Sequence, residues 1–105
     1  MPDQERNIRM TGKQRAYLRS LANTLPSKYQ FGKGEITENF LQQLREGLEA
    51  NELIKLTVLE NASVTARELC DQLAGLLEAE PVQVIGKKLV LYKESKNKKT
   101  IELPR

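Results

Sequence analysis

Two kinds of pattern alternate along this chain of 105 residues, and their order constrains the fold more than any other feature of the sequence. In three segments an apolar residue recurs every three or four positions behind a threonine, as is typical of an amphipathic helix with a capped first turn. These segments begin at Thr11, Thr37 and Thr65 and run to Leu25, Leu48 and Leu77. Runs rich in β-branched and apolar residues predict four strands, at Lys28–Phe31, Leu53–Leu59, Val82–Ile85 and Lys88–Tyr92.

Local signals support these boundaries. Gln14 follows Thr11 by three residues and Glu68 follows Thr65 by three, so each pair predicts a capping box at a helix start. Pro26 cannot continue a helix, and it should therefore end the first one.

The predicted order is α-β-α-β-α-β-β, which indicates an α/β fold. Two strand-helix-strand units should cross over in the right-handed sense, and the last two strands should form a hairpin. Gly86 and Lys87 separate those strands, as in a type II′ turn. We therefore expect a single-domain sandwich of a mixed four-stranded sheet and three helices over residues 10–105, behind a flexible leader at residues 1–9. Residues 94–100 should form an exposed basic segment.

The residue types argue against catalysis and metal binding. The chain has no histidine, which is the commonest general base and metal ligand. Its one cysteine, Cys70, excludes an internal disulfide and lies in an apolar helical series, so it should be buried. Glu46 and Glu49 are conceivable as the acid and base of an enzyme, but their helical spacing favours a solvated surface. We expect no enzyme activity, no cofactor and no metal.

Composition indicates an ordinary globular protein. Hydrophobic residues make up 39% of the chain, and no apolar run approaches the roughly 20 residues that span a bilayer. The first residues also lack the pattern of a secretory signal. We expect a cytoplasmic monomer without membrane contact.

Charge is unevenly distributed along the chain. Residues 1–35 carry a net charge of +4, residues 36–80 carry −6 and residues 81–105 carry +5. A fold that separates these segments would have one positive and one negative face, and the positive face would attract a polyanion. Charges segregated by chance on a solvated surface remain the alternative.

A glycine turn between the first strand and the second helix is a candidate phosphate contact. Gly32, Lys33 and Gly34 follow the strand, and glycine lets a sugar-phosphate chain approach the backbone closely. The helix start behind the turn offers unpaired N–H groups. An ordinary strand-to-helix turn would also contain glycine, so the turn alone does not identify a site.

Five blocks in order resemble a known family. They are Met10–Arg19, Gln30–Lys33 with Thr37–Asn39, Glu52–Lys55, Val82–Gly86 with Leu89–Tyr92, and Ile101–Arg105. Together they resemble the YhbY-like CRM (chloroplast RNA splicing and ribosome maturation) domain, in its stand-alone bacterial form. The resemblance implies a fold similar to the C-terminal domain of translation initiation factor three. It also implies binding to structured RNA, with a role in assembly of the large ribosomal subunit. The family's loop reads Gly-x-x-Gly, and here Glu35 takes its last position.

The resemblance and the charge pattern together predict an RNA-binding surface. We expect it to contact precursor ribosomal RNA of the large subunit through shape and phosphates, with ribosomal proteins as further partners. The predicted contacts are Lys13, Arg15, Arg19, Lys28, Gly32, Lys33, Gly34, Lys87 and Lys88. The alternative is a protein-binding assembly adaptor that acts through its acidic helices.

Overall fold

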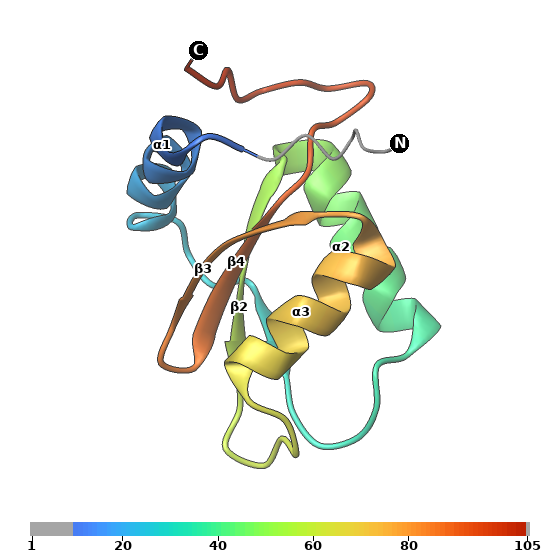
Figure 1. Cartoon of the computed structure of the whole chain (residues 1–105). Coiled ribbons are helices and arrows are strands. Elements are labelled where there is room, and N and C mark those ends of the chain that lie inside the picture. Colours follow the sequence, from blue (N-terminus) through green and yellow to red (C-terminus); the bar gives the residue numbers. More distant parts are fainter. Residues whose placement is uncertain (1–9, 105) are drawn as a thin grey trace, which may run out of the picture.

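The computed structural model describes residues 10–104 and confirms the expected order of three helices and four strands (Figure 1). The elements are α1 (Gly12–Ala22), β1 (Tyr29–Phe31), α2 (Glu38–Asn51), β2 (Leu53–Val58), α3 (Ala66–Leu77), β3 (Glu80–Ile85) and β4 (Lys88–Tyr92). The expected leader at residues 1–9 lies outside the described residues. No helix within the described range is long and apolar enough to cross a membrane.

The predicted helix starts are confirmed. The hydroxyl of Thr11 accepts a hydrogen bond from the backbone N–H of Gln14, and the Gln14 side chain accepts one from the N–H of Thr11, both at 3.1 Å. Thr65 and Glu68 form the same reciprocal pair at the start of α3. These contacts satisfy N–H groups that have no partner inside the helix.

The predicted end of the first helix was wrong by three residues. The last residue of α1 is Ala22, and the N–H of Asn23 closes the last turn on the carbonyl of Arg19. Pro26 disfavours helical geometry at the residue before it, so Leu25 lies outside the helix. Leu25 still packs against the smaller of the two apolar cores.

The sheet has the strand order β1-β2-β4-β3. β1 is parallel to β2, and β4 is antiparallel to both of its neighbours, so the predicted mixed sheet is confirmed. β3 starts earlier than predicted and includes Pro81, which an edge strand tolerates. A register shift between Pro81 and Gln83 marks a bulge. At the hairpin, Gly86 has a φ of 58° whereas Lys87 does not enter the positive region, as a type II′ turn requires.

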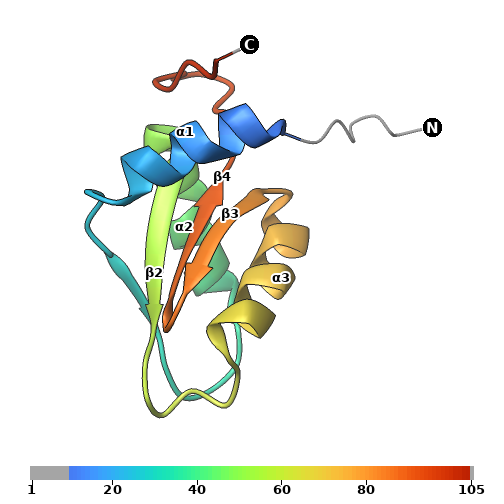
Figure 2. The same ribbon diagram turned by 60° about the vertical axis from the view of Figure 1, so that its left-hand side comes forward.

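The sheet separates two helical layers (Figures 1 and 2). Helices α2 and α3 cover one face, whose core is centred on Leu44, Leu56, Leu69 and Leu89. Helix α1 crosses the other face over a smaller core. Cys70 is buried in the larger core as expected, and its burial raises the pKa of the thiol.

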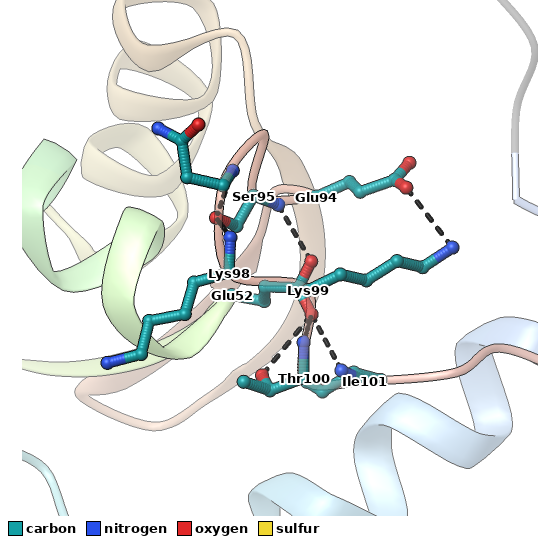
Figure 3. A network of polar contacts seen from close by, with 8 residues as sticks. Glu52, Glu94, Ser95, Lys98, Lys99, Thr100 and Ile101 are labelled. Carbon is teal, nitrogen blue, oxygen red and sulfur yellow. Dashed lines mark hydrogen bonds and ion pairs between the residues drawn. The ribbon is translucent and has the colours of Figure 1, made fainter.

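Residues 94–100 are exposed as expected, with the exception of Ser95, but a buried glutamate holds their backbone in place. Glu52 follows α2, is 0% exposed and has a left-handed backbone with a φ of 67°. Its carboxylate accepts from the backbone N–H groups of Ser95, Thr100 and Ile101 at 2.7, 2.8 and 2.7 Å (Figure 3). Burial alone would raise the pKa of Glu52, but these hydrogen bonds outweigh it and the pKa lies below its ordinary value. The C-terminal segment is thus tied to the end of α2, although several of its lysine side chains remain exposed.

Candidate nucleic-acid interface

Helix α1 covers only part of its sheet face. On β2, Leu53 belongs to the core beneath α1. Alternate residues of a strand share a face, so Lys55 and Thr57 lie on this face as well. β4 pairs Lys88 with Thr57, and β1 pairs Gln30 with Thr57. Beyond α1, the sheet therefore presents polar and basic side chains, together with the exposed side chain of Ile85, which pairs with Lys88.

Lys55 is the cation closest to α1 on the part of the sheet face that this helix leaves uncovered. Its Nζ donates to the carbonyl of Ala22, the last residue of α1, at 3.1 Å. Carbonyls at the C-terminus of a helix carry partial negative charge and favour a cation there. Lys55 is not among the contacts predicted from the sequence. A lysine between two core residues of an inner strand was nevertheless a usable signal, because such a lysine must emerge on an incompletely covered face.

The hairpin adds two more cations. Lys88 donates to the hydroxyl of Thr57 at 3.2 Å. Lys87 forms an exposed ion pair with Glu60 at 3.3 Å. These two lysines and Lys55 line one hollow, whose remaining residues are Asn23, Gln83, Ile85 and Val90. No carboxylate lines this hollow.

Lys28 completes this uncovered area from the other side. It precedes β1, which begins one residue later than predicted, is exposed, and lines a hollow together with Lys55. Among residues 10–104, no carboxylate lies within ion-pair distance of Lys28, Lys55 or Lys88. We call the surface formed by Lys28, Lys55, Lys87 and Lys88 the lysine face.

The three predicted cations of α1 do not line the hollow beside the hairpin, but Arg15 and Arg19 line a neighbouring one that shares Gln83 and Ile85 with it. The guanidinium of Arg15 donates to the carbonyl of Pro81 and lies 3.9 Å from the carboxylate of Glu80, so it ties α1 to β3. Arg19 is exposed and, with Arg15, lines a shallow hollow along β3. Lys13 is exposed on the first turn of α1. α1 thus carries Arg15 and Arg19 along the edge formed by β3.

The glycine bend lies at the far end of the sheet from α1. The N–H of Leu59 donates to the carbonyl of Phe31 at 2.8 Å, and the N–H of Val58 donates to that of Lys87 at 2.7 Å. These contacts bring the bend, the loop after β2 and the hairpin turn to the same end of the sheet, at the bottom of Figure 1. Lys33 and Gly34 are exposed, and Gly34 has a φ of 107°.

Two observations argue against a phosphate-binding site formed jointly by the bend and the start of α2. At Gly32, an added Cβ would lie 2.9 Å from the side-chain oxygen of Asn61, so the glycine accommodates a neighbouring loop. Helix α2 begins only at Glu38, and the hydroxyl of Thr37 already accepts from one of its free N–H groups, that of Phe40. The bend and the helix start therefore act as separate features.

The sheet separates charge, as the pattern along the chain suggested. The acidic residues of α2 and α3 lie on the helical layer opposite the lysine face; they are Glu38, Glu46, Glu49, Glu68 and Asp71. The cations from the two ends of the chain, however, do not all share one face. Lys96 lies in a hollow with Glu46 and Glu49, and Lys99 pairs with Glu94 at 3.2 Å. The lysine face thus lies on one side of the sheet, and a separate group of cations, which includes Lys96 and Lys99, lies near the end of α2.

The two carboxylates considered for catalysis, Glu46 and Glu49, differ in their surroundings. Glu49 accepts from the hydroxyl of Ser95 at 2.8 Å and from the backbone N–H of Asn97 at 3.1 Å. These bonds, led by that from Ser95, lower the pKa of Glu49. Glu46 accepts a hydrogen bond from the side chain of Gln42 at 3.2 Å on the exposed surface of α2. Within residues 10–104, no group of three or more His, Cys, Asp or Glu residues could hold a metal ion.

Comparison with known proteins gives concordant matches. The profile of the CRS1/YhbY (CRM) domain family matches residues 10–93. The Bacillus subtilis protein named "Probable RNA-binding protein YqeI" is 45% identical over 90% of this chain and 99% of its own length. A Haemophilus influenzae protein named "RNA-binding protein" is 33% identical over 91% of this chain and 96% of its own. The solution structure of SAV1595 from Staphylococcus aureus, described as a candidate RNA-binding protein, has a TM-score of 0.74, is 48% identical, and covers 91% of this chain and 100% of its own.

Proposed function

Since the chain belongs to the CRS1/YhbY (CRM) domain family, we propose that it binds structured RNA through the lysine face and the exposed glycine bend. We place this activity in the cytoplasm, in a monomer that assists assembly of the large ribosomal subunit on precursor ribosomal RNA. Relatives named as RNA-binding proteins support the ligand class. The resemblance of the chain to stand-alone bacterial members supports the role in assembly.

The observation that carries this proposal is the separation of charge by the sheet. The lysine face meets no carboxylate in its hollow, whereas the acidic residues of α2 and α3 lie behind the sheet. A phosphate chain is therefore attracted to one side of the molecule and repelled from the other. Ion pairs with phosphates provide affinity and orientation, with little selection of sequence.

The distribution of aromatic residues favours shape over base stacking as the main mode of recognition. Phe31 and Tyr92 are buried, and the ring of Phe31 lies 5.5 Å from that of Phe40. Tyr17 is the most exposed aromatic side chain in the described chain, at 39%. An extended row of exposed rings, on which successive bases could stack, is not present in residues 10–104.

Charge reversal tests the binding surface. Lys28→Glu and Lys88→Glu should each weaken binding to a folded fragment of large-subunit ribosomal RNA by about tenfold at fixed salt. Arg45→Glu changes the net charge equally but lies on α2, where Arg45 pairs with Glu38. This control should change affinity less than twofold. Equal losses in all three variants would show that net charge, and not the lysine face, governs binding.

Complementation tests the proposed role in assembly. Cells depleted of the protein should accumulate precursors of the large subunit, visible by sedimentation of ribosomal particles. Wild-type protein and Arg45→Glu should restore the profile, whereas Lys88→Glu should not. A normal profile in depleted cells would refute the assembly role and leave RNA binding standing.

A protein-binding adaptor is the second candidate. A hollow beside α2 is lined by the acids Glu46, Glu49 and Glu94 and by the bases Arg45, Lys93 and Lys96, so it offers ion-pair partners to a segment of a ribosomal protein that carries both charges. Under this alternative, Arg45→Glu and Glu46→Lys would alter binding to ribosomal proteins, and Lys88→Glu would have no effect in cells.

A further inference from the structure

A second hollow adjoins the lysine face. It has a volume of about 320 Å³, and Lys55 lines both this hollow and the one beside the hairpin. The ladder between β1 and β2 begins at Tyr29 and Leu56. The first half of β2 therefore has no strand on that side, and the hollow lies beside this uncovered stretch.

The walls of the hollow are aliphatic. They come from the end of α1, the segment after it, β2 and the C-terminal segment, and they include Leu21, Leu25, Pro26, Leu53 and Ile101. Figure 2 shows α1 ending over the start of β2, which places these walls on the side of the sheet that carries the lysine face. An apolar recess of this kind, with few polar groups, is typical of a site for a flat organic ring.

The polar groups at the hollow are suited to a nucleotide. Asn51 provides an amide with two donors and one acceptor, which can pair with the edge of a base. Lys28 and Lys55 provide positive charge for the phosphates on either side. No carboxylate lines this hollow, in contrast to the hollow beside α2, whose lining contains three carboxylates among its charged groups.

We propose that this hollow receives a single unpaired nucleobase of the bound RNA, while the neighbouring phosphates lie over Lys28 and Lys55. This inference rests on the proposed RNA-binding function and deepens it. Structured RNA exposes bulged bases that proteins bind individually, so one recess beside a phosphate track is sufficient. Tyr29 contributes only part of its ring, because its hydroxyl end packs against Gly47 of α2. The base therefore contacts mainly aliphatic side chains and the Asn51 amide.

The test compares two versions of one RNA hairpin. The first contains a single bulged adenosine, and the second has an abasic site at that position. Dissociation constants are measured for the wild-type protein and for Leu25→Trp, whose larger side chain should fill the hollow. Leu76→Trp is the matched control, because Leu76 is 52% exposed on α3, behind the sheet. Asn51→Ala serves as a second variant that leaves the apolar walls intact.

We expect the abasic site to weaken binding to the wild-type protein and to Leu76→Trp by about tenfold. For Leu25→Trp the two RNAs should bind within twofold of each other, and for Asn51→Ala the difference should shrink. Equal binding of the two RNAs to the wild-type protein would overturn the base site. If Lys88→Glu still weakened binding in that case, the proposed function would stand. If Lys88→Glu also had no effect, the proposed function itself would fail.

Discussion

Helices α2 and α3 are each followed by a glutamate with a left-handed backbone. Replacing these two glutamates by glycine should change the free energy of unfolding in opposite directions. Glu52 follows α2 with a φ of 67°, and Glu78 follows α3 with a φ of 55°. At each position a side chain costs about 1 kcal/mol relative to glycine. Glycine also makes the unfolded chain more flexible, which offsets part of that gain. For Glu78→Gly, whose side chain is exposed, we expect the free energy of unfolding to rise by about 0.5 kcal/mol.

Glu52→Gly should instead destabilise the protein. The substitution removes the acceptor of three backbone N–H groups, those of Ser95, Thr100 and Ile101. A hydrogen bond to a charged group contributes about 1.5–3 kcal/mol, so the gross loss is about 5–9 kcal/mol. Two effects reduce this gross loss. If the C-terminal segment detaches, water can replace the lost hydrogen bonds. The glycine also relieves backbone strain, which recovers about 1 kcal/mol. We therefore expect a net loss of about 2–4 kcal/mol.

Urea denaturation at pH 7, followed by circular dichroism, measures both variants against the wild type. A loss of 2 kcal/mol corresponds to a fall in Tm of about 8 °C or more for a domain of this size. If Glu52→Gly matched Glu78→Gly in sign and size, the carboxylate would not hold the C-terminal segment, and the reasoning about this network would be refuted.

Three further predictions concern acid stability, the glycine bend and a helix cap. Because its hydrogen bonds lower the pKa of folded Glu52, the stability they provide is present above the ordinary pKa and is lost as the pH falls below about 5. In urea titrations at several pH values, Glu52→Gln should reduce the fall in the free energy of unfolding below about pH 5. An unchanged fall would contradict the role given to Glu52. At the exposed bend, Glu35→Gly should leave RNA affinity unchanged or tighten it, whereas Lys33→Glu should weaken it; weaker binding by Glu35→Gly in a filter-binding assay would show a positive role for the acid. Thr65→Ala removes the cap of α3 and should lower the free energy of unfolding by about 1 kcal/mol in urea denaturation, with no change in RNA affinity.

Features set by local chemistry were predictable from the sequence. Thr11 and Thr65 mark helix starts because capping involves residues only three positions apart. The hairpin followed from Gly86, which adopts the positive φ that the turn needs. The sequence-based order of elements was correct for the same reason, since each element carries its own periodicity.

Features set by distant contacts were not predictable in this way. Glu52 looked like one more acid of an acidic segment, and only the fold brings the N–H groups of residues 95–101 to its carboxylate. Lys55 was predicted only as part of a strand, and its exposure on the sheet was not predictable because the extent of coverage by α1 depends on where that helix ends. The selected cations of α1 were correctly placed on one helix, but packing directs Arg15 to β3.

The dependence of RNA affinity on salt tests the central claim most directly. Each lysine that neutralises a phosphate releases counterions, so the logarithm of the association constant falls linearly with the logarithm of salt concentration. We predict a steep slope for the wild type, a slope shallower by about one unit for Lys28→Gln and for Lys88→Gln, and an unchanged slope for Arg45→Gln. An identical slope in all four proteins would contradict the account, because it would mean that phosphates do not bind at the lysine face.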